Sequence, residues 1–554
     1  MARTVKELMD MIKDNDIQMI DFKIVDINGQ FRHVTIPAEQ FSEKTLTEGI
    51  GFDASNYGYA VVEKSDMVFI PDLDTALVDP FCGVPTLSIT GNAMVIDYPE
   101  NRPLDQYPRN IVLAAEQYMK DSGIADEMLI LPEFEFHLFD DAGWSVTPEK
   151  ISMHVDTSQA YWNSDTEGKG CVVAHQKNYH VAKPFDTSYE CRSEMCLEMQ
   201  KAGIAIKYHH PEVGAAGQFE IEPMLGQMSK MADNTMMIKY IIHNTALKYG
   251  KTATFMPKPI YGEAGSGMHV HMLLMKDGQP VFSDDNGYSN LSKEAHYFMG
   301  GLLKHISSLC ALTNPSTNSF KRLVPGFEAP VTVGYATSNR SAVIRIPAYA
   351  KSPDKRRFEL RNPDATCNPY FCYAAILMAG LDGIKNKIDP HENGWGPYDV
   401  NLYHLPEEEK AKLQGLPTSL DSAASAVQRF TSGNGDVKKS TKYFLAVNNA
   451  ILAGGASADI QASALEQLSQ AYAKGRPDMM EWRTLMMAMP GQLNQVAKSM
   501  GKVDATQLGE ALRKGKISMN AFMDALVKLD TEGYGNFASF EDDVTDAMTF
   551  LDGL

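Results

Sequence analysis

Hydrophobic and ionic side chains alternate along four short segments of the chain, at residues 131–137, 217–222, 265–271 and 357–361. Successive side chains of an extended strand point to opposite faces, so this period of two predicts four strands, each with one apolar and one ionic face. The ionic positions are Glu133, Glu135 and His137; Gln218, Glu220 and Glu222; His269 and His271; and Arg357, Glu359 and Arg361.

The composition of these ionic faces points to a metal site. An antiparallel strand with one solvated face shows the same alternation, but ordinary surfaces mix both signs of charge. Here one segment carries acids, another only histidines, and a third an Arg-Glu-Arg series. Neighbouring acids resist ionisation unless a cation neutralises them. Glu with His and no Cys favours Mg²⁺ or Mn²⁺ over a zinc cage.

The rest of the pattern predicts an α+β fold. A helix at 4–14 precedes strands at 19–25 and 31–37, which flank the hairpin turn Asp26-Ile-Asn-Gly. Between the ionic strands, helical periodicity predicts an antiparallel sheet covered by helices on its outer face. These helices are expected at 109–121, 190–202, 232–249 and 293–312.

Beyond about residue 420 the composition changes. All fourteen histidines lie at or before His404, and apolar residues recur at helical spacing between Gly-rich breaks. This predicts a separate all-α module with a small core. Its methionines are expected to pack in that core: Met479, Met480, Met486, Met487 and Met489. The predicted domains are 1–105, 106–424 and 425–554.

Charge and cysteine usage argue against several classes of protein, namely nucleic-acid-binding, membrane-spanning and secreted proteins. A net charge of −19 argues against nucleic acid or an anionic membrane as the main partner. No apolar run approaches the ~20 residues of a membrane span. The N-terminus is charged where a signal peptide needs an apolar run, and the seven cysteines form no Cys-x-x-Cys. A cytoplasmic protein with reduced thiols is expected.

Arginines narrow the chemistry further. They are concentrated at Arg322, Arg340, Arg345, Arg356, Arg357 and Arg361. Arg binds phosphate and carboxylate in bidentate fashion, so metals opposed by arginines suit a polyphosphate and a carboxylate together. Phosphoryl transfer needs that arrangement. No P-loop and no Gly-x-Ser-x-Gly elbow occurs. The acids and histidines alone also allow a metal-dependent hydrolase, which would not need so many arginines.

The order of motifs from residue 1 to about 420 resembles type I glutamine synthetases. The matching stretches include Phe52-Asp-Ala-Ser, Pro132-Glu-Phe-Glu-Phe, His209-His-Pro-Glu, Gly217-Gln-Phe-Glu, Gly265-Ser-Gly-Met-His-Val-His, Asn339-Arg-Ser and Glu359-Leu-Arg-Asn-Pro-Asp. The resemblance implies a β-grasp-like N-terminal domain and a catalytic domain with a curved antiparallel sheet. It also implies the ATP-dependent joining of ammonia to glutamate through γ-glutamyl phosphate.

The resemblance also implies roles for single residues. Glu135, Glu212 and Glu220 would hold one Mg²⁺ or Mn²⁺, and Glu133, His269 and Glu359 a second. ATP would contact His271, Arg345 and Arg357. Glutamate would lie against Gly265, Arg322, Arg361 and Tyr179. Catalytic roles would fall to Asp53, as the base that deprotonates ammonium, to Glu328 on a flap, and to Arg340 at the phosphoryl group.

In this family the aspartate comes from the neighbouring subunit, which implies a homo-oligomer of hexameric rings, typically a dodecamer. Tyr403 matches a tyrosine that some members adenylylate, although an unmodified loop tyrosine is an equal interpretation.

Some positions depart from the family pattern, namely Ala54, Asn56, Leu131 and Ala264. They leave a γ-glutamyl ligase for another amine, such as a polyamine, as the alternative, and a catalytically silent assembly or regulatory protein as a third hypothesis. The stretches Phe430-Thr-Ser-Gly-Asn-Gly-Asp-Val, Phe444-Leu-Ala-Val-Asn-Asn-Ala-Ile-Leu-Ala-Gly-Gly and 486–491 follow. Through them, residues from about 425 to 554 resemble part of a phage tail tape-measure protein.

Overall fold

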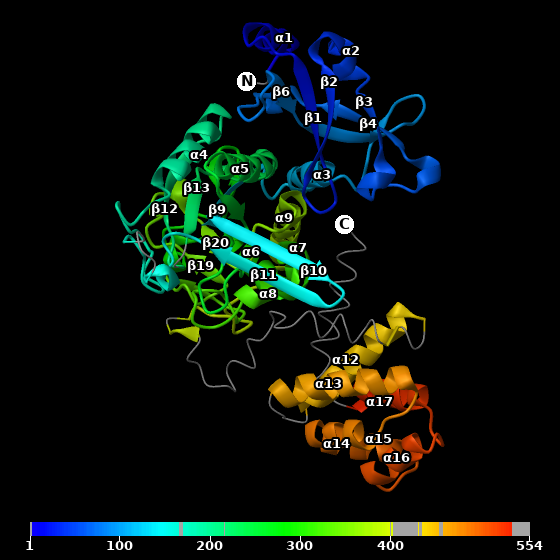
Figure 1. Cartoon of the computed structure of the whole chain (residues 1–554). Coiled ribbons are helices and arrows are strands. Elements are labelled where there is room, and N and C mark those ends of the chain that lie inside the picture. Colours follow the sequence, from blue (N-terminus) through cyan, green and yellow to red (C-terminus); the bar gives the residue numbers. More distant parts are fainter. Residues whose placement is uncertain are drawn as a thin grey trace. The chain divides into compact units, whose positions relative to one another are not determined.

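The computed structural model describes residues 3–165, 170–214, 217–398, 400–402, 430–431, 435–453 and 458–533. Residues 1–416 and 417–554 form two separate compact units, and each is described by itself (Figure 1). Among the described residues, no helix is both long and apolar enough to cross a membrane.

The N-terminal part contains two four-stranded sheets, in the orders β2-β1-β6-β5 and β3-β4-β7-β8. The predicted hairpin is confirmed, because Asp26 Oδ1 accepts the backbone N–H groups of Asn28 and Gln30, and Gly29 adopts a φ of +73°. The elements are α1 Val5–Asp14, β1 Met19–Val25, β2 Phe31–Pro37, α2 Glu43–Thr47, β3 Ile50–Asp53, β4 Asp66–Pro71, β5 Leu77–Val78, β6 Thr86–Ile89, β7 Gly91–Val95 and β8 Arg102–Pro103.

The large sheet has ten described strands, and its main path runs β12-β13-β9-β16-β20-β19-β18. Apart from the parallel pair β18–β19, neighbouring strands on this path are antiparallel. The strands are β9 Glu127–Phe139, β12 Ile206–Pro211, β13 Gln218–Pro223, β14 Gly226–Gln227, β15 Thr252–Thr254, β16 Met268–Lys276, β17 Gln279–Pro280, β18 Tyr335–Thr337, β19 Ile344–Ile346 and β20 Phe358–Leu360. All four predicted ionic segments therefore contribute strands to one sheet.

Helices cover the sheet, as predicted. Helices α3 and α5 pack on β9, and α9 packs against α3, α5 and α6. The helices are α3 Pro108–Asp121, α4 Tyr189–Lys201, α5 Met228–Lys248, α6 Lys293–Lys304, α7 Ile306–Thr313, α8 Thr317–Arg322 and α9 Pro369–Asn386. The prediction of a single helix at 293–312 is wrong, because this segment forms two helices, α6 and α7. His305 leaves helical geometry with a ψ of 9°, and its Nε2 lies 2.9 Å from Asp382 Oδ2.

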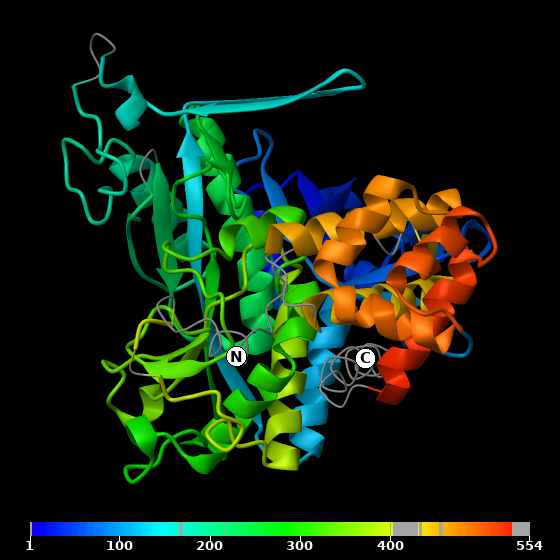
Figure 2. The same ribbon diagram turned by 90° about the horizontal axis from the view of Figure 1, so that it is seen from below.

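A two-stranded ribbon extends from the end of β9 (Figure 2). It consists of β10 Asp141–Thr147 and β11 Lys150–Asp156. Its largest apolar side chains are exposed: Trp144, Val146, Ile151 and Met153. Four exposed apolar side chains on one short ribbon are typical of a contact surface rather than of a solvated hairpin.

The second unit is all-α, as predicted. Its helices are α12 Val437–Ala453, α13 Ala458–Lys474, α14 Met479–Ala488, α15 Pro490–Ser499, α16 Ala505–Arg513 and α17 Met519–Gly533. They share a core of residues such as Leu468, Leu485 and Phe522. The expected methionine core is wrong for Met479, Met480 and Met487, which are exposed. Met489 is buried and Met486 packs against the core from the side.

Candidate active site

The register of three strands places acids and histidines in rows across the sheet. Glu220 of β13 is paired with His210 of β12 on one side and with Glu135 of β9 on the other. Two residues along β9, Glu133 is paired with His269 of β16. Because side chains two apart on a strand share a face, both rows lie on the same side of the sheet.

A second set of ionic residues continues this face toward β19. His271 of β16 is paired with Glu359 of β20, which is paired in turn with Arg345 of β19. His271 Nε2 lies 2.8 Å from Glu133 Oε1, and His269 Nδ1 lies 3.1 Å from Glu133 Oε2. Strands distant in the sequence thus bring their charged groups into one continuous cluster.

Three groups of side chains in the described residues have ligand atoms close enough to hold a metal ion, with every atom of a group within 4.8 Å of the others. The groups are Glu133, His271 and Glu359; His210, Glu212 and Glu220; and Glu133, Glu220 and Glu222. Carboxylate oxygens with one imidazole suit Mg²⁺ or Mn²⁺. The six metal ligands predicted from the sequence remain predictions. Four of them belong to these groups: Glu133, Glu212, Glu220 and Glu359.

His269 and Glu135 join the cluster through longer contacts. His269 Nδ1 lies 3.5 Å from Glu359 Oε1, and its Nε2 lies 3.8 Å from Glu135 Oε1. Glu135 Oε2 accepts the backbone N–H of Gly267 at 2.6 Å. A Cβ at Gly267 would meet Arg322 Nη2 at 2.3 Å, so a larger residue here would displace the Arg322 side chain.

The carboxyl groups divide into two electrostatic classes. Burial and the charge of Glu135 raise the pKa of Glu212 to about 8, and burial with the neighbouring charges of Glu133 and Glu212 raises that of Glu220 well above its usual value. Burial also disfavours the charge on Glu359, but Arg361 outweighs it and lowers the pKa to about 2. Burial next to like charges therefore disfavours the ionised forms of Glu212 and Glu220.

Arginines line the same cluster from β19 and β20. Arg345 Nε donates to Glu359 Oε2 at 2.7 Å, and Arg361 pairs with the other oxygen of Glu359. Arg357 Nε lies 3.3 Å from His271 Nδ1. Arg361 Nε is buried and has no hydrogen-bond partner among the described residues, so it remains available to an anionic ligand.

Arg322 and Glu328 both form hydrogen bonds with Arg361. Arg322 donates to the backbone oxygens of Arg361 and Asn362 at 3.0 and 2.8 Å. The backbone oxygen of Glu328 accepts from Arg361 Nη2 at 3.0 Å. Glu328 has a φ of +56°, which is uncommon for a residue with a Cβ and typical of constrained functional loops. Arg340 Nη1 lies 3.8 Å from Glu328 Oε2.

Two further predicted substrate contacts lie near the Glu212 group. Tyr179 stacks on His180, with ring centroids 3.9 Å apart, and borders a cavity of about 600 Å³ that also includes His210 and Tyr208. Gly265 accepts from Gln218 Nε2 at 2.8 Å through its backbone oxygen. Tyr403 lies outside the described residues.

Asp53 does not belong to this cluster within the chain. It ends β3 in the N-terminal part, where Oδ1 accepts from Ser55 Oγ at 2.6 Å and Oδ2 from Asn56 Nδ2 at 2.7 Å. Hydrogen bonds from Ser55, with smaller ones from Ser65 and Asn56, lower its pKa. No hydrogen bond or ion pair in the described part of the chain joins Asp53 to the metal-site acids.

Two residues of the cluster had no assigned role in the sequence. His210 Nε2 lies 3.4 Å from Glu220 Oε1, and Glu222 is fully buried beside Glu133 and Glu220. The sequence signal for His210 was its spacing of two from Glu212. Glu222 had the same spacing from Glu220, but which neighbouring acid it would meet depends on strand register.

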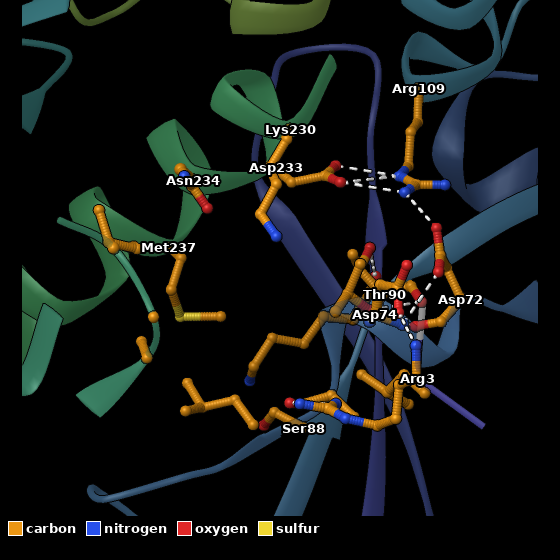
Figure 3. A pocket seen from close by; sticks show the side chains of 18 of the residues that line it. Arg3, Asp72, Asp74, Ser88, Thr90, Arg109, Lys230, Asp233, Asn234 and Met237 are labelled. Atoms are coloured by element: carbon orange, nitrogen blue, oxygen red, sulfur yellow. Dashed lines mark hydrogen bonds and ion pairs between the residues drawn. The ribbon is translucent and has the colours of Figure 1, made fainter. Parts of the chain in front are cut away.

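A separate pocket of about 270 Å³ lies between the N-terminal part and α5 (Figure 3). Arg109 spans it, donating to Asp233 at 3.0 Å and to Asp72 at 2.6 Å. These bonds tie the segment after β4 to helices α3 and α5. None of the metal-site acids lines this pocket. Its paired charges therefore indicate a structural role, the attachment of the N-terminal sheets to the helices.

Three family models match this chain. Residues 16–95 match "Glutamine synthetase, beta-Grasp domain" and residues 105–432 match "Glutamine synthetase, catalytic domain". Residues 410–552 match "Tape measure protein".

Curated relatives match about three quarters of the chain. Glutamine synthetase of Frankia alni is 43% identical over 77% of this chain and 90% of its own length. Glutamine synthetase of Escherichia coli (strain K12) is 43% identical over 76% of this chain and 89% of its own length. The 3-hydroxylaminophenol mutase of Cupriavidus pinatubonensis (strain JMP 134 / LMG 1197) is 44% identical over 76% and 89%.

Two solved structures are similar to this chain. Plasmodium falciparum glutamine synthetase covers 70% of this chain and 76% of its own, with a TM-score of 0.63 and 30% identity. GmaS without ligand covers 87% and 99%, with a TM-score of 0.62 and 25% identity.

Proposed function

Because the chain belongs to the glutamine synthetase family, we propose that it joins ammonia to glutamate with ATP, through a γ-glutamyl phosphate, and so makes glutamine. The family supports glutamine synthesis or a related glutamate ligation. The observation that carries the more specific reaction is the cluster on β9, β13, β16 and β20, where metal-binding acids lie beside buried arginines. The order of its motifs supports the type I class.

The donor set fits the divalent metals that the family uses. Burial and the crowding of its acids raise the pKa values of Glu212 and Glu220, and a divalent cation would offset the repulsion between these acids. We assign Glu135, Glu212 and Glu220 to one ion and Glu133, His269 and Glu359 to another. When bound, Mg²⁺ or Mn²⁺ would neutralise charge on the nucleotide and on the acyl phosphate.

The arginines support the assignment of two substrates. The free donor of Arg361, beside Arg322 and the Gly265 loop, suits the carboxylate of glutamate. Arg345 and Arg357, next to His271, suit the phosphates of ATP. Catalysis then depends mainly on position and charge neutralisation.

Two loop residues complete the proposed chemistry. Arg340 would stabilise the phosphoryl group in transfer, because its side chain is half exposed and reaches toward the site from Asn339-Arg. Glu328, on its constrained backbone, would close over the acyl phosphate and exclude water. Tyr179 would border the glutamate pocket.

Asp53 is the proposed base, and it acts on the site of a neighbouring copy. Its carboxylate is exposed and ionised, as a base for ammonium requires, but it lies apart from the cluster of its own chain. The exposed apolar side chains of β10 and β11 support assembly with further copies. We therefore propose a ring-shaped homo-oligomer.

Another amine is the second candidate nucleophile. Asn56 contacts Asp53 where relatives of the type I class carry a serine, so the space around the nucleophile differs. The relative named as a mutase shows that family members have other activities.

The test is phosphate release from ATP with glutamate, first with ammonium and then with putrescine and methylamine. Release that depends on ammonium supports the proposal. Phosphate release with putrescine or methylamine but not with ammonium would make that amine the nucleophile. No phosphate release with any of them would favour a catalytically silent assembly or regulatory protein.

The remaining assignments concern organisation. We propose domain boundaries at 1–105, 106–424 and 425–554, and a cytoplasmic location as for the family's soluble enzymes. The helical module has no proposed role in the reaction.

A further inference from the structure

His137 on β9 is a buried histidine that the proposed reaction does not use. It shares a face of its strand with Glu133 and Glu135, so it lies on the active-site side of the sheet. Its Nδ1 lies 3.0 Å from Ser266 Oγ, whereas its buried Nε2 has no hydrogen-bond partner among the described residues. A buried ring nitrogen without a partner is costly. An apolar ring would avoid this cost, so the histidine needs a reason other than core packing.

Ser266 belongs to a tightly held loop, residues 264–267, which leads into β16 and contains Gly265. The Ser266 backbone N–H donates to the backbone oxygen of Pro257 at 2.8 Å. A Cβ at Gly265 would lie 2.3 Å from that same oxygen, so the two backbones pass very close to each other. Any change in how Ser266 is held would therefore move the backbone of Gly265.

The sheet register brings two anchors to this loop. His137 of β9 lies directly opposite Gln218 of β13. Gln218 Nε2 donates to the backbone oxygen of Gly265 at 2.8 Å, while His137 holds the side chain of the next residue, Ser266. The His137 ring is itself fixed by stacking on Phe139, with ring centroids 5.5 Å apart. Two cross-strand neighbours thus hold two successive residues of the loop.

We propose that His137 is a positioning residue for the amino-acid substrate. By holding Ser266 it fixes the backbone of Gly265, which receives the amino-acid end of glutamate in the proposed site. The inference rests on the proposed function, because that function assigns Gly265 to glutamate. Either tautomer of the imidazole can make the contact, since the Ser266 hydroxyl can donate or accept. In this role His137 acts through the loop and not on the reacting atoms.

The competing interpretation is a hydrogen bond that only stabilises the core. His137→Phe removes the bond and the unpaired Nε2 but keeps a ring that can stack on Phe139. It leaves the buried Ser266 hydroxyl without this partner, which lowers stability. The double variant with Ser266→Ala removes both partners, and such a replacement can be nearly neutral for stability. Stability and substrate affinity therefore separate in the double variant.

His296 on α6 supplies a matched control. Its Nδ1 lies 2.9 Å from the backbone oxygen of Ser292, and its Nε2 is buried without a hydrogen-bond partner among the described residues, as in His137. Its ring contacts are with Tyr288 and Tyr335 and not with the loop 264–267. His296→Phe therefore repeats the chemical change away from the proposed substrate contact.

The first experiment measures phosphate release by the full-length protein while glutamate and ATP are varied in turn. For His137→Phe and for the double variant we expect the KM for glutamate to rise about tenfold, the equivalent of one hydrogen bond. The KM for ATP and kcat should change little, because the lost contact serves binding. His137→Asn, whose amide lies near the place of Nδ1, should restore most of the affinity. His296→Phe should leave both KM values unchanged.

The second experiment measures hydrogen exchange of the backbone amides at 264–268 by mass spectrometry, without substrates. We expect faster exchange in His137→Phe and in the double variant, but not in His296→Phe, because the loop loses an anchor. Unaltered exchange would overturn the inference, as would a glutamate KM that stays unchanged or that recovers together with thermal stability in the double variant.

Calorimetric titration with glutamate in the presence of Mn²⁺ separates this inference from the proposed reaction. It gives the glutamate affinities of the same variants without turnover. Absence of phosphate release by the unchanged protein would reject the proposed reaction alone. Equal calorimetric affinities of the unchanged protein and His137→Phe would reject the role of His137 alone.

Discussion

Glu220 of β13 lies directly opposite Glu135 of β9, as an antiparallel neighbour in the centre of the large sheet. Like charges opposite each other destabilise a sheet. Burial and the neighbouring acids raise the pKa of Glu220, which limits the repulsion between the two carboxyl groups. The sheet register itself therefore creates the demand for a metal.

Removal of one acid from this pair should abolish the reaction. For Glu135→Ala we expect ammonium-dependent phosphate release to fall by about a hundredfold or more, since positioned charge stabilisation is lost. The control is Glu127→Gln at the start of the same strand, outside all candidate metal groups. Full activity of Glu135→Ala would reject the proposed metal role.

Metal affinity should depend on pH through Glu212. Its pKa is raised to about 8, so below that pH a cation must displace a proton. Mn²⁺ affinity should then rise by about tenfold per pH unit for each displaced proton, up to about pH 8. Titration of Glu212→Gln should show a slope smaller by one proton, and an identical slope would contradict this assignment.

The same group predicts how the metal-free protein responds to alkali. A carboxyl group whose pKa is raised by folding binds its proton more tightly in the folded state. Its contribution to stability is therefore lost as pH rises toward about 8. Denaturation in chelator should give a lower free energy of unfolding at pH 8 than at pH 7. Added Mn²⁺ should remove that difference.

Active sites shared between subunits should show complementation. Asp53→Asn and Glu359→Gln are each expected to be inactive, because one removes the base and the other a metal ligand. In co-expressed mixed rings about a quarter of the sites receive both intact residues, and activity should return to that extent. Mixed rings without activity would show that each site is built from one chain.

The β10–β11 ribbon should contribute to assembly. Trp144 and Ile151 are about 80% exposed, and each buried apolar side chain contributes about 1.5–3 kcal/mol. The double variant Trp144→Ser, Ile151→Ser should shift the protein toward smaller species in analytical ultracentrifugation. Thr147→Ser at the polar end of the same ribbon is the control. An unchanged size distribution would exclude the ribbon from the interface.

The helical unit should be energetically separable from the catalytic reaction. Leu485 is fully buried in its core, and Leu485→Ala should destabilise that unit by about 2–5 kcal/mol. Thermal unfolding should show a lowered transition for this unit, while ammonium-dependent phosphate release stays unchanged. A parallel loss of activity would link the unit to the reaction.

The sequence alone determined the elements and their polarity. Alternation of period two identified the strands of Glu133, Glu220, His269 and Glu359, since side-chain direction in a strand follows from local geometry. The Asp26–Gly29 turn fixed the first hairpin, because its hydrogen bonds are local. Motif order was enough to predict the family.

Only the tertiary structure decided which ionic groups meet. The pairing of β13 with β9 brings Glu222 next to Glu133, and the break at His305 follows from its contact with Asp382 on another helix. Strand register and helix breaks of this kind depend on contacts between residues far apart in the chain. Periodicity within one segment cannot encode them, because it specifies a face and not the neighbour across it.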